Sequence, residues 1–197
     1  MVLFRFKGSL NLELLGSKKT LQEGAMIKQE MERALNEQLK WEFYSAYLYL
    51  AMAAYFEDQG LEGFAHWMKS QSAEELMHAM KFYKFIAERD GRVILEEIPA
   101  PPKDWDSPEG VFDFAYKHEQ EVTARINKLM SLAKGLEDYA TENFLQWFVE
   151  EQVEEEASFK TILSKLRLIQ RDPQALFYLD KELGQRPLDL NLLMTQA

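Results

Sequence analysis

Cysteine is absent from this 197-residue chain, and a long apolar run is missing as well. Without cysteine there can be no disulfide, thiolate zinc site, iron–sulfur cluster or cysteine nucleophile, and the absence fits a reducing cytoplasm. No apolar run reaches the roughly 18 residues that a membrane span needs. The net charge of −10 disfavours nonspecific binding to nucleic acid and favours attraction of cations. We therefore expect a cytoplasmic protein that binds neither membranes nor nucleic acid.

The composition divides the chain into three parts. Residues 1–26 carry four basic and two acidic side chains, whereas the rest of the chain is strongly acidic. This segment lacks the continuous apolar stretch and the cleavage site of a secretory signal. We interpret it as an N-terminal extension: a tag, an upstream start before Met26, or a docking arm. Residues 27–185 are predicted to form one domain, and residues 186–197 a C-terminal tail.

Hydrophobic periodicity predicts four long helices and one short one. Apolar residues recur at the i, i+3, i+4, i+7 spacing over residues 28–58, 61–89, 107–134 and 139–170. Ser107-Pro108 is a typical N-cap and first-turn pair at the start of the third helix. Asp172-Pro173 is a second such pair, and it begins a short fifth helix that ends near Gly184.

The link between the second and third helices is much longer than the other links. Residues 90–107 include three prolines, which prevent a helix in the middle of the segment. A helix of about 28 residues is about 42 Å long, and 18 extended residues can reach about 60 Å. The segment can therefore cross the whole bundle and make the second and third helices parallel. The predicted fold class is all-α: a four-helix bundle with one long crossover and a short fifth helix.

Each long helix places at least one carboxylate on its apolar face. Glu75 and His78 stand three residues apart, on one face of a helix that is otherwise apolar there. Glu42 and Glu119 occupy comparable positions on two other helices, and the fourth carries the cluster Glu151, Gln152, Glu154 and Glu155. One such glutamate could lie at the edge of the apolar face and reach solvent. Four together indicate a metal centre, because a buried ionised glutamate is costly unless it is paired or binds a metal.

Carboxylates with one imidazole suit iron or manganese, and the spacing suggests two metal positions. The first is predicted to take Glu42, Glu75 and His78. The second is predicted to share Glu75 and to add Glu119 with either Glu155 or Gln152. Three further carboxylates lie one step off the core face, as either solvated surface charges or a third metal position: Glu74, Glu151 and Glu154.

The chain resembles the non-haem ferritins of bacteria and archaea, members of the ferritin-like di-iron superfamily. The segments that carry the resemblance are EFYSAYLYLAMAAYF, AEELMHAM, YKHEQ and FLQWFVEEQVEEE, and it extends over residues 28 to 185. It implies that residues 27–185 form a ferritin-like di-iron domain whose ferroxidase ligands are Glu42, Glu75, His78, Glu119 and Gln152. It also implies that Tyr49 lies beside this centre and that Glu155 is shared with a third site, which is completed by Glu74, Glu151 and Glu154.

The resemblance further implies a function. The protein would be an enzyme, a ferroxidase that oxidises Fe(II) to Fe(III) with O2 at a di-iron centre and stores the product as a ferric oxyhydroxide mineral. Storage needs an enclosed volume, so the expected partner is the chain itself, in a hollow shell of 24 subunits. No haem is expected, because Leu76 stands where bacterioferritins have their haem-binding methionine. The alternative is a soluble di-iron oxidase or oxygenase that acts on an organic substrate.

Two other histidines are expected to have no role in the metal centre. His66 is predicted to be a partly exposed helix residue. His118 points about 100° away from Glu119 on the same helix, so it is predicted to lie on the surface.

Overall fold

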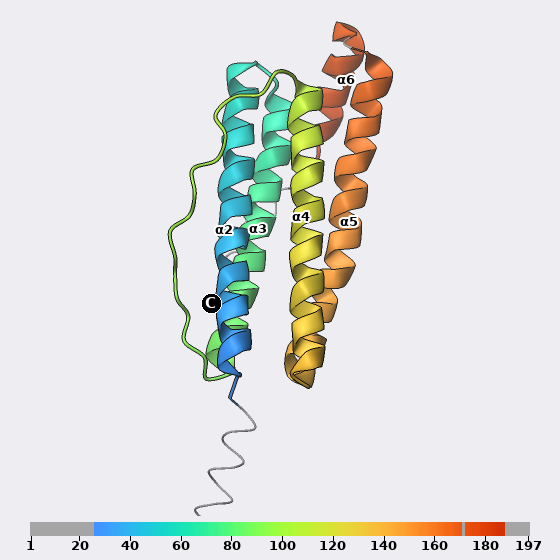
Figure 1. Ribbon diagram of the computed structural model, residues 1–197. Coiled ribbons are helices and arrows are strands. Elements are labelled where there is room, and N and C mark those ends of the chain that lie inside the picture. The colour runs from blue at the N-terminus through green and yellow to red at the C-terminus, as the bar shows by residue number, and fades with distance from the viewer. Residues whose placement is uncertain (1–25, 171, 188–197) are drawn as a thin grey trace, which may run out of the picture.

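The structure, a computed structural model, describes residues 26–170 and 172–187 (Figure 1). Within them the chain forms helices and no strand: α2 (Gln29–Asp58), α3 (Glu62–Glu88), α4 (Pro108–Gly135), α5 (Tyr139–Ile169) and α6 (Pro173–Leu183). Each helix agrees with its predicted range to within one residue. The predicted extension, residues 1–26, lies outside the described residues except for Met26, as does most of the tail 186–197. None of the helices described is long and apolar enough to span a membrane.

The long crossover has the predicted course. In Figure 1 it runs along the outside of α2 and brings the chain back to the end of the bundle where α3 began, so α3 and α4 are parallel. Asn36 of α2 holds it in place: its Nδ2 donates to Arg92 O at 3.0 Å, and its Oδ1 accepts from Ile94 N at 2.7 Å. Lys40 forms an ion pair with Glu96 at 2.8 Å. The all-α four-helix bundle with one crossover and a short fifth helix is confirmed.

Side-chain caps fix the start of α4 and α6 at the predicted residues. Ser107 Oγ accepts from Gly110 N at 3.1 Å, and Asp172 Oδ1 accepts from Gln174 N at 2.9 Å. In both helices a proline follows the cap directly. The cap satisfies one of the N–H groups that a helix leaves unpaired at its first turn, and proline has no N–H to leave unpaired.

A glycine lets α6 pack closely on the start of α3. A Cβ atom at Gly63 would lie 1.7 Å from the backbone oxygen of Asp180, so no other residue fits there without displacing α6. The Asp180 side chain completes the contact, since its Oδ1 accepts from Phe64 N at 3.0 Å. This contact holds the chain that follows α6 close to α3.

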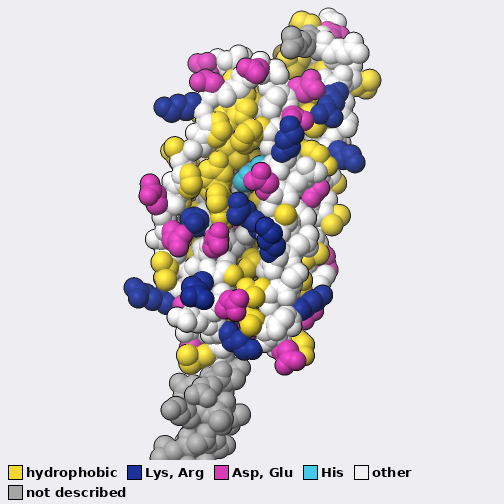
Figure 2. All heavy atoms as spheres, in the orientation of Figure 1, with side chains coloured by type: hydrophobic (Ala, Val, Ile, Leu, Met, Phe, Trp, Pro, Cys, Tyr) yellow, Lys and Arg dark blue, Asp and Glu magenta, His cyan; other side chains and the backbone are white. Residues whose placement is uncertain are grey.

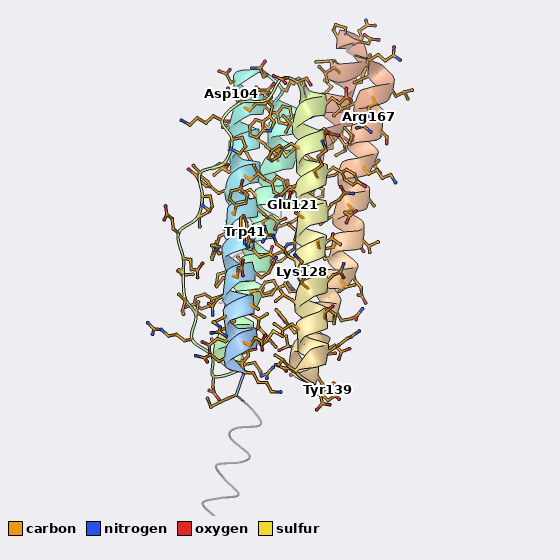
Figure 3. All side chains as sticks on the ribbon, in the orientation of Figure 1. Trp41, Asp104, Glu121, Lys128, Tyr139 and Arg167 are labelled. Atoms are coloured by element: carbon orange, nitrogen blue, oxygen red, sulfur yellow. The ribbon has the colours of Figure 1, made fainter. Side chains whose placement is uncertain are left out.

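The apolar core is divided into two halves. Side chains fill the space between the helices along the whole bundle (Figure 3). One half includes Leu48, Met52, Phe56, Phe64, Phe112 and Phe159. The other includes Leu35, Leu39, Phe82, Ile126, Leu145 and Phe148. The four long helices contribute six buried polar side chains that lie between the two halves of the core. We call them the polar layer: Glu42, Glu75, His78, Glu119, Gln152 and Glu155.

Candidate metal centre

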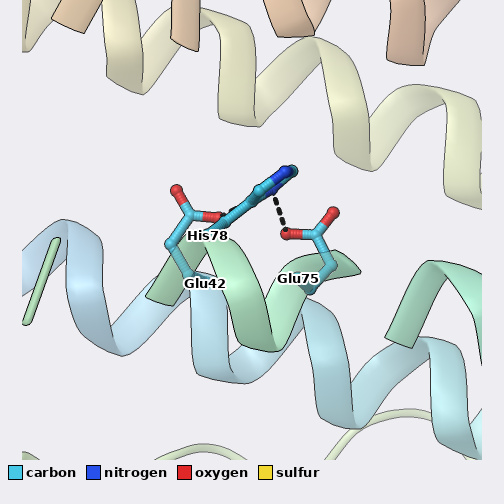
Figure 4. Close-up of side chains that lie close together, drawn as sticks. All are labelled: Glu42, Glu75 and His78. Atoms are coloured by element: carbon cyan, nitrogen blue, oxygen red, sulfur yellow. Dashed lines mark ion pairs between the residues drawn. The ribbon is translucent and has the colours of Figure 1, made fainter. Parts of the chain in front are cut away.

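Three residues of the polar layer meet at one point. Glu42 comes from α2, Glu75 and His78 come from α3, and none is more than 2% exposed. One ligand atom from each lies within 4.8 Å of the other two. His78 Nδ1 is 3.4 Å from Glu75 Oε2 and 3.9 Å from Glu42 Oε2, and Figure 4 shows the two carboxylates on either side of the imidazole. The structure thus brings together the residues predicted to form the first metal position.

Several atoms of this group lack a hydrogen-bond partner among the described residues. They are Glu42 Oε2, Glu75 Oε2 and His78 Nε2. The other oxygen of Glu42 is satisfied, because Gln38 Nε2 donates to it at 2.8 Å. A buried polar atom without a partner costs about 1–3 kcal/mol, and natural structures contain few of them. Glu42 Oε2 and Glu75 Oε2 both face His78 Nδ1, so these three atoms are the ones that a metal ion between the residues would use. His78 Nε2 faces Glu151 instead.

Tyr49, Glu119 and Gln152 meet on the other side of the polar layer. The Tyr49 O–H donates to Glu119 Oε1, and Gln152 Nε2 donates to Glu119 Oε2 at 3.1 Å. These residues come from α2, α4 and α5, and all three are buried. Both oxygens of Glu119 are therefore occupied, so a metal ion would have to compete with two donors there.

Glu155 of α5 completes the polar layer. It is 5% exposed, and its Oε2 accepts from Gln71 Nε2 at 2.8 Å. Burial raises the pKa of Glu155 well above its ordinary value, and repulsion from the Glu119 carboxylate adds to this rise. Glu155 and Glu119, which are both predicted for the second metal position, are thus both buried in the polar layer.

The pKa shifts of the centre favour exchange of protons for a cation. Burial raises the pKa of Glu42 and of Glu119 from 4.5 to about 7. Burial, followed by repulsion from Glu119 and Glu42, raises the pKa of Glu75 well above 4.5. The pKa of His78 moves the other way, to about 3, because of burial and then the nearby Lys81. At neutral pH the imidazole is therefore unprotonated and free to bind a metal, while the carboxyls retain protons that a metal would replace.

Comparison with known proteins identifies the fold family. The ferritin-like domain matches residues 32–169. The bacterial non-haem ferritin of Bacteroides fragilis (strain 638R) is 40% identical over 161 residues, which cover 82% of this chain and 100% of that protein. An open-pore ferritin from the archaeon Archaeoglobus fulgidus has a TM-score of 0.81 and 55% identity, over 82% of this chain and 99% of that chain. This chain belongs to the ferritin family. The resemblance found in the sequence is thereby confirmed.

The three carboxylates off the core face lie on the outer side of this ferritin's polar layer. We call Glu74, Glu151 and Glu154 the outer cluster. Glu151 Oε1 is 3.9 Å from His78 Nε2, Glu74 is partly exposed, and Glu154 is exposed. Burial raises the pKa of Glu151, and repulsion from Glu154 and then Glu74 adds to it, so the three carboxylates are close enough to interact. Glu74 is also ion-paired, because Arg186 Nη2 donates to its Oε2 at 2.6 Å.

Two glutamines of the centre are missing from the set predicted for this ferritin. Gln38 and Gln71 are buried and donate to Glu42 and Glu155. Each stands four residues before a glutamate of the polar layer on its own helix, Gln38 before Glu42 and Gln71 before Glu75. An amide at this spacing shares the helix face of the glutamate. The four-residue spacing could therefore have identified both glutamines from the sequence as neighbours of the centre.

The prediction that His118 lies on the surface is wrong. His118 is 9% exposed, and its Nε2 lies 2.8 Å from Ser45 Oγ of α2. Burial, followed by the charge of Arg125, lowers its pKa to about 4. The reason lies in the width of the apolar face of α4. His118 is in phase with one row of buried residues, Val111, Ala115 and Val122, while Glu119 is in phase with another, Phe112 and Ile126.

Proposed function

We propose that this ferritin oxidises Fe(II) with O2 and stores the Fe(III) that forms. Each subunit binds two Fe(II) ions as substrate in its polar layer. The first ion is bound by Glu42, Glu75 and His78. The second is bound by Glu75 and Glu119, with Gln152 or Glu155 as a further ligand. The outer cluster, with Glu155, forms a third position between this centre and the store.

The reaction balances as an electron transfer. Two Fe(II) ions each lose one electron, and one O2 with two protons takes up both electrons to give hydrogen peroxide. Reduction to water uses four electrons and four protons. The anionic oxygens of the centre stabilise Fe(III) more than Fe(II), which lowers the reduction potential. Tyr49 takes part by holding Glu119 through its O–H.

Storage is proposed to take place inside a closed homo-oligomer of 24 subunits in the cytoplasm. An exposed apolar area supports self-association (Figure 2). It includes Tyr47 and Leu50 of α2, which are 51% and 49% exposed and line a groove of about 520 Å³ together with Pro101 and Pro102 of the crossover. Large exposed apolar side chains next to one another are typical of protein–protein contacts.

One observation carries the proposal. In a member of the ferritin family, carboxylates from all four long helices and one imidazole lie buried between two apolar half-cores, and several of their atoms have no hydrogen-bond partner among the described residues. A hydrophobic core without a metal gains nothing from such a layer. This arrangement favours iron chemistry over a purely structural role.

Aerobic loading with Fe(II) tests the proposal. The protein receives Fe(II) far in excess of three ions per chain and is then analysed by size-exclusion chromatography, with iron and protein measured in each fraction. We expect iron in large excess to elute with a particle much heavier than 23.1 kDa. We also expect Glu42→Gln to slow oxidation, while Glu37→Gln, at an exposed position of the same helix, does not. Iron that stops at two or three ions per chain, with the rest precipitating, would support the di-iron oxidase instead.

A further inference from the structure

Arg186, which follows α6, lies against the outer cluster. Its Nη2 is 2.6 Å from Glu74 Oε2, although 112 residues separate the two in the sequence. The Glu74 side chain is 31% exposed and that of Arg186 23% exposed, so the pair sits at the boundary between the polar layer and solvent. The positive charge of Arg186 also opposes the raised pKa of Glu155, which follows chiefly from burial, so its influence extends to the polar layer.

Three further contacts fix the position of Arg186. Its guanidinium lies 4.7 Å from the centre of the Trp67 ring, a cation–π distance. Its backbone oxygen accepts from His66 Nε2 at 2.7 Å. The close packing of α6 on Gly63 holds the preceding residues in place. Because several contacts fix the position of Arg186, its guanidinium has a defined place beside Glu74.

The guanidinium is nevertheless not fully satisfied. Its Nη1 is buried and has no hydrogen-bond partner among the described residues. An arginine that pairs with a carboxylate through both nitrogens of its fork is held strongly, and Arg186 uses only one. A cation with two charges could therefore displace it from Glu74 at moderate cost.

We propose that Arg186 is the resident counter-ion of the outer cluster, and that a metal ion must displace it from Glu74 in order to bind there. This inference rests on the proposed function, because it concerns the third metal position. A guanidinium at Glu74 occupies a carboxylate oxygen that the metal needs, and its charge repels a divalent cation. Arg186 thus lowers the affinity of the outer cluster more than that of the two inner positions, because it pairs with Glu74 at the boundary between the polar layer and solvent. Iron therefore binds most strongly at the two inner positions, where it is oxidised, and more weakly at the third position, which it passes before it is stored as mineral.

Equilibrium titration with Zn2+, which is redox-inert, tests this role on the assembled protein. Arg186→Gln removes the charge and keeps much of the side-chain length, and we expect it to strengthen binding of the third ion about tenfold, the scale of one lost charge interaction at close range. The affinity for the first two ions should change much less than the affinity for the third. Arg186→Lys keeps the charge and should resemble the wild type. The matched control is Lys165→Gln, which removes an exposed positive charge that pairs with Glu182 instead.

The outcomes separate the two proposals. In a Glu74→Gln background, Arg186→Gln should have no effect, because the counter-ion has lost its partner. If two ions bind but Arg186→Gln leaves a third ion unchanged, weaker or absent, Arg186 is not a competing counter-ion and the ferroxidase proposal still stands. A protein that binds no Zn2+ at the inner positions overturns both proposals.

Discussion

Replacing Glu42 by glutamine should make the metal-free protein more stable. Glu42 is 1% exposed and its Oε2 has no hydrogen-bond partner among the described residues. Its other oxygen accepts from Gln38 Nε2, a bond that the amide oxygen of a glutamine can also accept. The substitution therefore removes a buried charge and keeps the shape and one hydrogen bond of the side chain. Without metal, burying that charge costs more stability than its interactions return, because burial outweighs the hydrogen bonds and the charge of Arg125 that favour the carboxylate.

The pKa of Glu42 gives the magnitude. Burial raises it from 4.5 to about 7. Each tenfold change in proton affinity is about 1.4 kcal/mol, so ionising this carboxyl in the folded protein costs about 3 kcal/mol more than in the unfolded chain. Because the folded-state pKa is the higher one, the stability contributed by the protonated carboxyl is complete below pH 4.5. It is lost as the pH rises through about 7.

Thermal unfolding at pH 8 in the presence of a chelator is the assay. With about 2–4 °C for each kcal/mol in a chain of this size, Glu42→Gln should raise Tm by about 10 °C. Protein concentration must be equal in all samples, because subunit association also shifts Tm. Glu37→Gln removes a charge from an exposed position of α2 and should leave Tm nearly unchanged. Added Zn2+ should make the Tm of the wild type higher than that of Glu42→Gln. The ion stabilises the wild type by binding to it, and the variant lacks one of the metal ligands.

The pH dependence provides the refutation. At pH 4.5 the difference between Glu42→Gln and the wild type should be small, since the carboxyl is then protonated in the folded protein and about half protonated in the unfolded chain. A variant that is less stable than the wild type at pH 8 without metal would show that the Glu42 carboxylate is satisfied in the folded protein. The argument for a metal centre from buried, unpaired atoms would then fail.

Three other predictions concern protons and packing. Zn2+ binding should release more protons at pH 6 than at pH 8, because Glu42 and Glu119, with pKa values of about 7, are largely protonated only at the lower pH. Titration calorimetry in buffers of different ionisation enthalpy measures the number of protons released. Equal release at the two pH values would contradict the prediction. Gly63→Ala should cost about 1–3 kcal/mol by overpacking against α6, with faster hydrogen exchange in α6 as the sign, and unchanged exchange would show that α6 adapts. Phe82→Ala removes a fully buried ring whose centre lies 4.4 Å from that of Phe148, and it should lower the free energy of unfolding by about 3–5 kcal/mol, measured by denaturant unfolding. A loss below about 1 kcal/mol would mean that the core collapses around the site.

The helices of this protein follow from local sequence. Apolar periodicity places each helix to within one residue, because the face that a helix buries repeats along its own sequence. Ser107 and Asp172 fix two helix starts by capping, an interaction over a few residues. The length of the crossover and its prolines predict that α3 and α4 are parallel, because the segment can span the whole bundle without forming a helix. The candidate ligands could be predicted for the same reason, since Glu42, Glu75 and Glu119 each stand in phase with apolar neighbours.

Which faces meet, and at what rotation, was decided only by the tertiary structure. The periodicity of α4 could not show that His118 faces Ser45 of α2, because two neighbouring rows of the helix are both buried. Nor could any local pattern pair Arg186 with Glu74 across 112 residues, since that contact depends on how α6 packs on Gly63. Sequence by itself determined the helices, their order and the kinds of ligand they carry. The partners of those ligands depend on the packing of distant helices, which is a property of the whole fold.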